Sequence, residues 1–94
     1  MAVMEREIEA ELVRMIEAAG GKCLKWVCPG WAGVPDRICL LPGGKVFFVE
    51  TKRPKGGRLS KLQEYWGKQL VKLGFRWYTA YDKTDLLLIR MLEL

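Results

Sequence analysis

The sequence has no histidine, and this single absence removes several kinds of catalytic centre. Ser-His-Asp and Cys-His nucleophile systems, histidine general bases and most zinc sites all need an imidazole. No stretch of the chain approaches the roughly 18–20 consecutive apolar residues of a membrane-spanning helix, so we expect no membrane association. Any enzyme built from this sequence must therefore work with carboxylates and lysine.

The three cysteines form no Cys-x-x-Cys pair, which excludes redox and zinc motifs of that type. An odd number of cysteines in a half-hydrophobic chain predicts reduced, buried thiols and a cytoplasmic location. The acidic N-terminal segment is also unlike a signal peptide, which begins with positive charge. With no internal repeat and no low-complexity linker, the 94 residues predict a single domain over 1–94.

Acidic residues are scarce after the first helix-like segment, and positive charge dominates there. Residues 1–20 carry five acids and two bases, whereas residues 21–94 carry six acids and fourteen bases. The whole chain has a net charge of +5 and a pI near 9.3. This excess favours a polyanionic partner but is too small to identify one.

Hydrophobic periodicity predicts helices interleaved with strands. Apolar residues at three- and four-residue spacing predict helices over 3–19, 60–73 and 82–92. Asp82 or Thr84 is expected to cap the last of these helices. Strands are expected at 22–28, 36–41, 45–52 and 76–81. The order helix, three strands, helix, strand, helix predicts an α/β fold with a mixed four-stranded sheet flanked by helices.

A tight turn at residues 42–44 predicts a hairpin that brings two carboxylates together. If the residues flanking the turn pair, Asp36 faces Glu50, and directly opposed side chains point to the same face of a sheet. Lys52 shares that face because strand side chains alternate. Paired carboxylates suit Mg²⁺, and a nearby ammonium group orients a water or stabilises an oxyanion. The hairpin therefore predicts a site that hydrolyses phosphodiesters.

A structural interpretation of the same residues stays open at this point. A Glu-x-Lys triplet on a strand is usually a solvated charge pair. Here residues 46–49 are apolar on both faces of the strand, which puts Glu50 at the end of a buried strand, where an unpartnered charge is costly. A shift of one residue in the strand register would nevertheless separate the two carboxylates.

Together these motifs resemble the PD-(D/E)XK nuclease superfamily. The segment Gly33–Asp36 (GVPD), the triplet Glu50–Lys52 (ETK) and the downstream Gln63 are most similar to the virus-type replication-repair nuclease (VRR-NUC) domain in its stand-alone phage and bacterial form. Residues 29–52 carry most of the resemblance, and the order of elements extends it over nearly the whole chain. The resemblance implies one VRR-NUC nuclease domain over 1–94, with a restriction-endonuclease-like α-β-β-β-α-β-α core.

The resemblance also implies a role for each residue of the motif. Asp36, Glu50 and the backbone carbonyl of Thr51 would bind Mg²⁺, for which Mn²⁺ substitutes. Lys52 would position the attacking water or stabilise the pentavalent phosphate, and Gln63 would orient Lys52 or the water. Gln63 also stands at the capping-box position of the predicted second helix, and the two roles are compatible.

An acidic residue on the first helix would complete the site in this family. Glu9 matches the family pattern of Glu followed three residues later by Leu, so it is our first choice, and Glu5 is our second. Acidic residues in a first helical turn are also common for a purely structural reason, because they interact favourably with the helix dipole.

The loop after the ETK triplet is the predicted DNA contact. The candidate DNA-binding residues are Arg53, Lys55, Arg58 and Lys61, extended by Arg37 and Lys25. Contacts of this kind give affinity but little sequence information. A loop that only increases solubility is the competing interpretation.

Two apolar features have open interpretations as well. Trp31 lies in the glycine- and proline-rich loop before Asp36, where it either stacks on an unpaired base or packs onto the protein. The last predicted helix is apolar on more than one face, which favours burial against a second subunit or in the core of the monomer.

As a whole, the resemblance implies a Mg²⁺-dependent, structure-specific DNA endonuclease of the Holliday-junction-resolvase type. We expect a homodimer that acts on branched or junction DNA, uses no nucleotide cofactor and works in the cytoplasm of a bacterium or of a phage-infected host cell. Two alternatives stay open: a non-catalytic or partner-dependent DNA-binding module, and a flap or nicking nuclease of the same superfamily.

Overall fold

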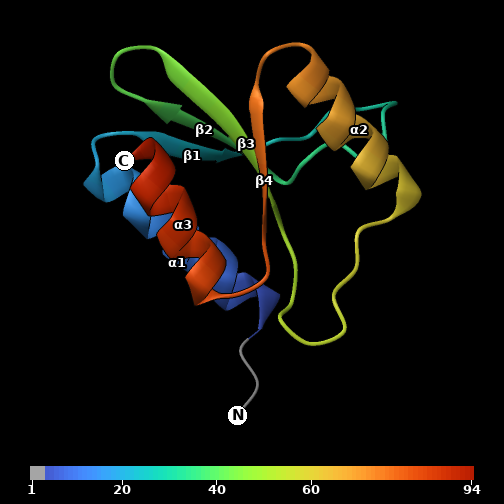
Figure 1. Cartoon of the computed structure of the whole chain (residues 1–94), viewed down its shortest axis with the longest axis horizontal. Helices are drawn as coiled ribbons and strands as arrows, with labels where there is room; N and C mark the ends of the chain where they lie inside the picture. The colour runs from blue at the N-terminus through green and yellow to red at the C-terminus, as the bar shows by residue number, and fades with distance from the viewer. Residues whose placement is uncertain (1–3) are drawn as a thin grey trace.

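The computed structural model describes residues 4–94, and these residues form a four-stranded sheet and three helices (Figure 1). The elements are α1 (Glu5–Ala18), β1 (Lys22–Lys25), β2 (Arg37–Leu41), β3 (Lys45–Thr51), α2 (Lys61–Lys72), β4 (Arg76–Ala80) and α3 (Lys83–Glu93). The strands lie in the order β1-β2-β3-β4, with antiparallel pairs up to β3 and a parallel β3–β4 pair. The predicted element order and mixed sheet are confirmed. None of the described helices is long and apolar enough to cross a membrane.

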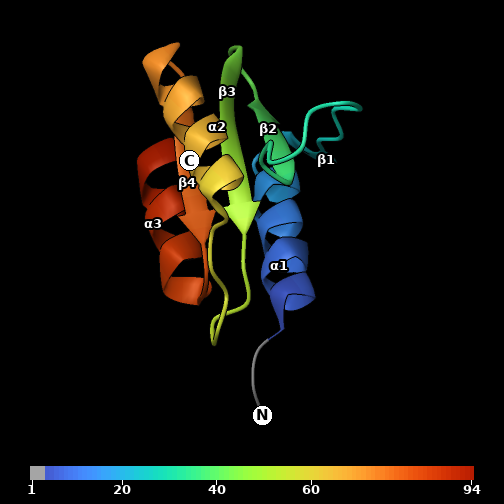
Figure 2. The same cartoon turned by 90° about the vertical axis from the view of Figure 1, so that its right-hand side faces the viewer.

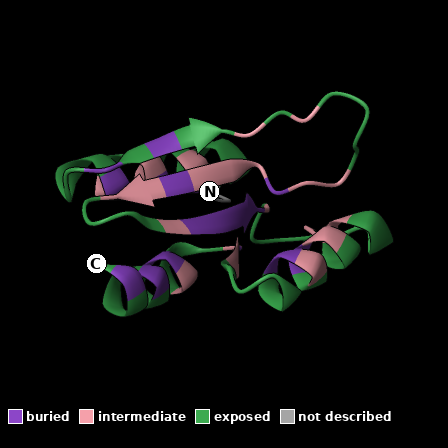
Figure 3. Ribbon diagram, turned by 90° about the horizontal axis from the view of Figure 1, so that it is seen from above, coloured by how far each residue is buried: buried purple, intermediate pink, exposed green. Residues whose placement is uncertain are grey.

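The main core lies between the sheet and the pair formed by α1 and α3. Phe47 and Val49, alternate residues of β3, are fully buried together with Ile8, Leu12 and Ile16 of α1. Figure 1 shows β4 edge-on, with α1 and α3 on one side of the sheet and α2 on the other, and Figure 2 shows the strands side by side with α2 in front of them. Figure 3 shows buried residues gathered in the sheet and on the facing sides of the helices. The central strand β3 is thus covered on both faces, as its continuous apolar run predicts.

The second helix packs on the opposite face of the sheet from α1 and α3. Its Gly67 is buried against Trp77 of β4, where an added Cβ would lie 2.3 Å from the indole ring. A side chain at this position would push α2 away from the sheet. The close approach therefore sets the distance between α2 and the strands that it covers.

The hairpin has the predicted register. Leu41 pairs with Lys45 and Arg37 pairs with Val49, around a turn in which Gly43 and Gly44 have φ values of 85° and 77°. Positive φ at two successive turn residues is a conformation that glycine adopts without steric cost. The same register, extended by one residue, sets Asp36 opposite Glu50 at the end of the ladder.

The first strand is shorter than predicted. It ends at Lys25, although the apolar pattern suggested a strand over 22–28. Pro29 cannot donate to a ladder, and the chain turns away instead. The Trp26 N–H donates to the Asp36 carbonyl at 2.8 Å, which joins the two ends of a long loop. We call residues 26–36 the pinned loop.

The helix ends agree with the sequence signals. Ser60 begins α2 in a complete capping box with Gln63, and Asp82, rather than Thr84, caps α3 by accepting the Asp85 N–H. The first helix begins at Glu5, and residue 3 of the predicted 3–19 helix lies outside the described residues. Two helix starts are therefore fixed by side chains that the sequence already identifies.

A buried carboxylate ties the end of α3 to the sheet. The Glu93 side chain is 1% exposed and accepts hydrogen bonds from Arg76 and Tyr78 of β4. Lys45, at the start of β3, donates to the Glu93 backbone carbonyl at 2.9 Å. This network lies where β3 begins, at the opposite end of that strand from Asp36 and Glu50.

The cysteines are free, and two of them are buried as predicted. Cys23 and Cys39 are paired residues of β1 and β2, with their sulfur atoms 3.8 Å apart beneath α1. Cys28 is only half-buried, because it lies in the pinned loop rather than in a strand.

Candidate metal and nucleic-acid site

Asp36 and Glu50 meet where β3 ends. Asp36 immediately precedes β2, and Glu50 is the penultimate residue of β3 and only 1% exposed. The Asp36 Oδ2 atom accepts the Thr51 N–H at 3.0 Å and the Thr51 hydroxyl at 2.9 Å. Only the backbone carbonyl of Thr51 is expected from the sequence to take part, whereas its hydroxyl also bonds to Asp36. The signal for this bond is the position of a hydroxyl residue directly after the glutamate.

Burial and crowding both disfavour the charged form of Glu50. Removal from water is the largest cause, and the hydrogen bond to Asp36 and its negative charge add to it, so that the pKa of Glu50 rises to about 8. The Lys52 ammonium group opposes this rise, and the charge of Glu5 adds to it slightly. At neutral pH the raised pKa favours the protonated form of Glu50, and a cation would relieve the same repulsion.

Gln63 joins the start of α2 to this pair. Its Oε1 accepts the Ser60 N–H at 2.8 Å, and its Nε2 donates to Glu50 Oε1 at 3.2 Å. Because a backbone N–H only donates, the amide oxygen must face Ser60, and Nε2 is left to face Glu50. The capping role predicted for Gln63 is confirmed, and the same amide contacts Glu50 rather than Lys52.

The two candidate acids of α1 have different surroundings. Glu9 pairs with Arg37, with 3.3 Å between Oε2 and Nε, and both side chains are largely buried. Glu5 is close enough for its charge to raise the pKa of Glu50, and it lines a hollow together with Lys52. The structure thus favours Glu5, our second choice, over Glu9 as the helix acid beside the carboxylate pair.

A hollow of about 360 Å³ opens at Lys52, two residues after Glu50. It is lined by Glu5, Lys52, Arg53, Gly56, Gly57 and Arg58, and we call it the basic hollow. At Gly57 an added Cβ would lie 2.3 Å from the Arg53 carbonyl oxygen, so this tight loop requires glycine. The fold of the loop brings three cationic side chains to one edge of the candidate site.

The other predicted DNA contacts differ in accessibility. Lys55, Lys61 and Lys25 are exposed. Arg37 is not: its side chain is 16% exposed, donates to the Cys23 carbonyl at 3.2 Å and pairs with Glu9. This burial argues against the predicted DNA contact of Arg37 and indicates a structural role between β2 and α1.

The carboxylate pair suits magnesium better than a metal that needs a full protein cage. Within residues 4–94, no group of three or more Cys, Asp or Glu side chains is arranged to hold a metal ion. Mg²⁺ commonly takes one or two carboxylates, keeps several waters and completes its shell with substrate phosphates. Asp36, Glu50 and the Thr51 carbonyl would supply oxygen ligands of this kind, and the raised pKa of Glu50 indicates that negative charge is crowded there.

Comparisons with known proteins support the fold and give one partial sequence match. No model of a known protein family matches the chain. Among curated proteins, it is 48% identical over 52 residues to "Putative nuclease p44" of Acyrthosiphon pisum secondary endosymbiont phage 1. That match covers 55% of this chain and 56% of the relative, so the chain spans about half the length of the relative. A solved structure described as "VRR_NUC domain" superimposes with a TM-score of 0.90 over 98% of this chain and all of the other, at 20% identity.

Proposed function

We propose that this chain, which has the fold of a VRR_NUC domain, is a metal-dependent nuclease that hydrolyses DNA phosphodiester bonds. The observation that carries the proposal is the convergence of Asp36, the buried Glu50 and Gln63 at the end of β3, beside Lys52 and the basic hollow. The name of the phage relative is consistent with it. Backbone phosphates are the natural ligands for the cations of the hollow.

Each residue of the candidate site has a separate role in the proposed reaction. Asp36, Glu50 and the Thr51 carbonyl would hold Mg²⁺ or Mn²⁺, which supplies Lewis-acid activation of the phosphodiester. Glu50, whose pKa is raised to about 8, must lose its proton to bind the metal, and the amide of Gln63 holds its carboxylate in place. Lys52 offsets the negative charge that develops on the phosphate. Arg53 and Arg58 bind the DNA backbone and keep the phosphate at the carboxylate pair.

A cleavage panel tests this proposal directly. Labelled duplex, single strand, flap, splayed arm and four-way junction DNA are incubated with Mg²⁺, Mn²⁺ or EDTA. We expect metal-dependent cutting that falls by roughly 10²-fold or more in Lys52→Ala, because a preorganised charge at the transition state is lost. Lys83→Ala, which removes an exposed lysine at the start of α3, serves as the matched control and should cut normally.

The panel also separates the finer alternatives. Paired cuts in the four-way junction would support a Holliday-junction resolvase. Cuts confined to flaps or splayed arms would keep the nuclease and exclude the resolvase. Binding without cutting in any metal would overturn the proposal and leave a DNA-binding module or a partner-dependent subunit.

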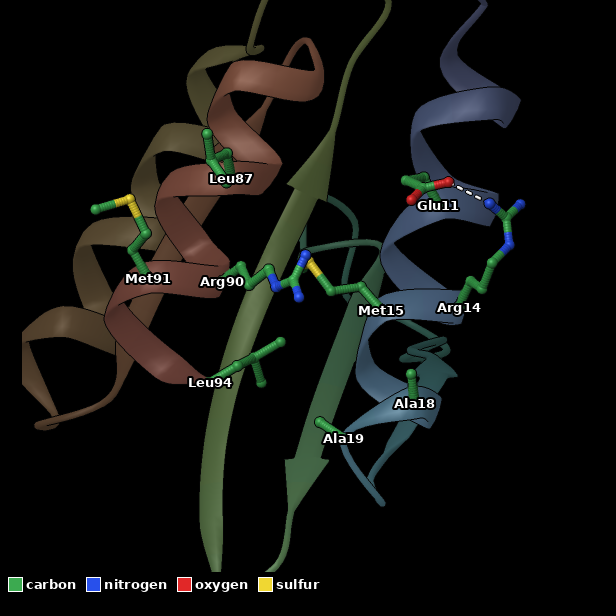
Figure 4. A pocket seen from close by; sticks show the side chains of 9 residues that line it. All are labelled: Glu11, Arg14, Met15, Ala18, Ala19, Leu87, Arg90, Met91 and Leu94. Atoms are coloured by element: carbon green, nitrogen blue, oxygen red, sulfur yellow. Dashed lines mark hydrogen bonds and ion pairs between the residues drawn. The ribbon is translucent and has the colours of Figure 1, made fainter.

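We further propose that the chain acts as a homodimer through the groove between α1 and α3 (Figure 4). This groove has a volume of about 700 Å³ and is lined by Glu11, Arg14, Met15, Ala18, Ala19, Leu87, Arg90, Met91 and Leu94. Leu86 and Ile89 fill the monomer core, but Leu87, Leu88 and Met91 of the same helix stay more than half exposed. A second copy is the simplest cover for such a face and would provide two active sites for two strands.

Sedimentation velocity checks the dimer. Met91→Glu is expected to shift a micromolar sample from dimer to monomer and to turn paired junction cuts into single nicks, because a charge is placed in the apolar contact. Leu73→Glu is the matched control, since Leu73 is 72% exposed and Met91 73%, but Leu73 lies at the end of α2. A wild-type protein that sediments as a monomer with its DNA would contradict the dimer.

A further inference from the structure

Three aromatic side chains of the pinned loop and α2 lie together without being absorbed into the core. Trp31 of the pinned loop is 61% exposed and Tyr65 of α2 is 52% exposed. Trp66 lies between them: its ring meets Trp31 edge-to-face at 5.8 Å and Tyr65 at 5.6 Å. We call Trp31, Tyr65 and Trp66 the aromatic platform. The structure argues against one of the two interpretations of Trp31, because its side chain contacts Trp66 but is not completely packed onto the protein.

Backbone hydrogen bonds and a close contact with α2 position Trp31, although it lies in a loop. The Trp31 N–H donates to the Cys28 carbonyl at 3.0 Å, and the loop ends are joined by the bond between Trp26 and Asp36. Gly33 has a φ of 92° and lies against Leu62, where an added Cβ would be 2.6 Å from Cγ. Only glycine lets the loop lie this close to α2. An aromatic group fixed in advance loses little conformational entropy when a flat ligand stacks on it.

The charge around the platform favours a nucleic acid over a protein or a lipid tail. On α2, Lys61, Tyr65, Lys68 and Lys72 follow one another at spacings of four, three and four residues, so they share one exposed face of the helix. Tyr65 therefore lies within a row of lysines. A backbone of phosphates along this row, with its bases on aromatic rings, is the arrangement found in proteins that bind single strands.

The platform is also tied to the carboxylate pair through the chain itself. Trp31 lies in the same loop that ends at Asp36, and Trp66 lies three residues after Gln63 on α2, about one turn or 5 Å along the helix. Gln63 in turn contacts Glu50. Both elements that carry the platform thus carry a residue of the candidate site, and a base stacked there adjoins the phosphate that the site would hold.

We propose that the aromatic platform stacks an unpaired nucleobase next to the cleaved bond. The substrate class is then DNA with an unpaired nucleotide beside the cleavage position, rather than continuous duplex. The position of the base next to a cleaved bond rests on the proposed nuclease function, but the stacking itself is a binding property. It is therefore tested in the absence of metal.

Fluorescence anisotropy in EDTA measures the stacking. Three labelled probes are compared: a fully paired duplex, the same duplex with one unpaired thymidine, and the same duplex with an abasic site in place of that thymidine. We expect Trp31→Ala to bind the thymidine probe about tenfold more weakly, with less than a twofold change on the other two probes. Trp31→Phe should recover most of the loss, because a π-face is restored.

Val27→Ala is the matched control, since Val27 is an apolar residue of the same loop that is 73% exposed. It should leave all three affinities unchanged. An equal loss on all probes in Trp31→Ala would overturn the proposal in favour of a general backbone contact. No loss on the thymidine probe would overturn it outright, and so would a Trp31→Ala protein whose sedimentation shifts from dimer to monomer, since the platform would then be a subunit contact.

Failure of the nuclease proposal has a different signature. A protein that selects the thymidine probe through Trp31 but cuts no DNA with any metal has the platform without the nuclease. A protein that cuts with Mg²⁺ but binds the three probes alike has the nuclease without the platform.

Discussion

Replacing Glu50 with glutamine is expected to abolish cleavage and, at the same time, to stabilise the metal-free protein at alkaline pH. The substituted amide would keep the hydrogen bond from Gln63 but carry no charge, so it mimics protonated Glu50 and cannot bind a cation as a carboxylate does. We expect the cleavage rate to fall by roughly 10²–10³-fold or more. The Mg²⁺-induced rise in melting temperature should vanish with it. Thermal unfolding and the cleavage assay provide the two measurements.

The pH dependence of this variant follows from the raised pKa of Glu50. Burial and the adjacent Asp36 hold that pKa at about 8, above the 4.5 of an unperturbed glutamate. Between these values the folded state binds more protons than the unfolded state, so the free energy of unfolding falls as the pH rises. The limiting slope is about 1.4 kcal/mol per pH unit, and it should disappear in Glu50→Gln.

Magnesium should reverse this trend, because it binds the ionised form of the site. Its stabilising effect is therefore expected to grow as the pH rises toward and past 8. Glu64→Gln makes the same chemical change at an exposed position on α2 and is the control. An unchanged pH slope in Glu50→Gln would contradict the buried-pair electrostatics, and unchanged cleavage would remove Glu50 from the site.

The second large effect is expected at Glu93, at the opposite end of β3. Glu93→Ala should lower the free energy of unfolding by about 2–4 kcal/mol, because Arg76 and Tyr78 lose a shared buried partner. Burial acts to raise the pKa of Glu93, but the hydrogen bonds from Arg76 and Tyr78 outweigh it, and the pKa is lowered. This contribution is present above the unfolded pKa and is lost as the pH falls through the folded value, which is the reverse of Glu50.

Urea unfolding at neutral and acidic pH measures the Glu93 effect. The control is Glu64→Ala, which removes an exposed carboxylate on α2, outside the proposed dimer groove. Surface substitutions of this kind usually change the free energy of unfolding by no more than about 0.5 kcal/mol. Equal losses in the two variants would contradict a special role of the buried network.

The fold was largely accessible from sequence because its strongest signals are local. The turn at 42–44 and the alternation around it fix the hairpin register, and Ser60, Gln63 and Asp82 mark the starts of two helices. The predicted first strand is too long, because the apolar residues before Pro29 have the pattern of a strand. In the structure these residues form the base of the pinned loop. Loop residues that pack on other elements carry no periodicity that would distinguish them.

The parts of the site that sequence reasoning did not settle depend on packing between elements. Glu5 and Glu9 lie one helical turn apart, and which one faces the carboxylate pair depends on Arg37, a partner from another strand. The contact between Gln63 and Glu50 depends on how closely α2 approaches the sheet, which Gly67 permits. The pairing of Asp36 with Glu50 could be predicted from the sequence, because a single hairpin brings the two residues together.

The hydrogen bond between the Trp26 N–H and the Asp36 carbonyl fixes the position of Asp36 whatever the length of the loop between these two residues. Residues 27–32, which precede the close contact of Gly33 with Leu62 and the buried Pro35, can be lengthened, shortened or replaced while both ends of the loop stay in place, since closing a somewhat longer loop costs little entropy. Variation in DNA preference is therefore expected to accumulate in this segment without disturbing the proposed cleavage site. For protein engineering, it is an exchangeable cassette: a segment from another source can be grafted here and tested for a new DNA preference.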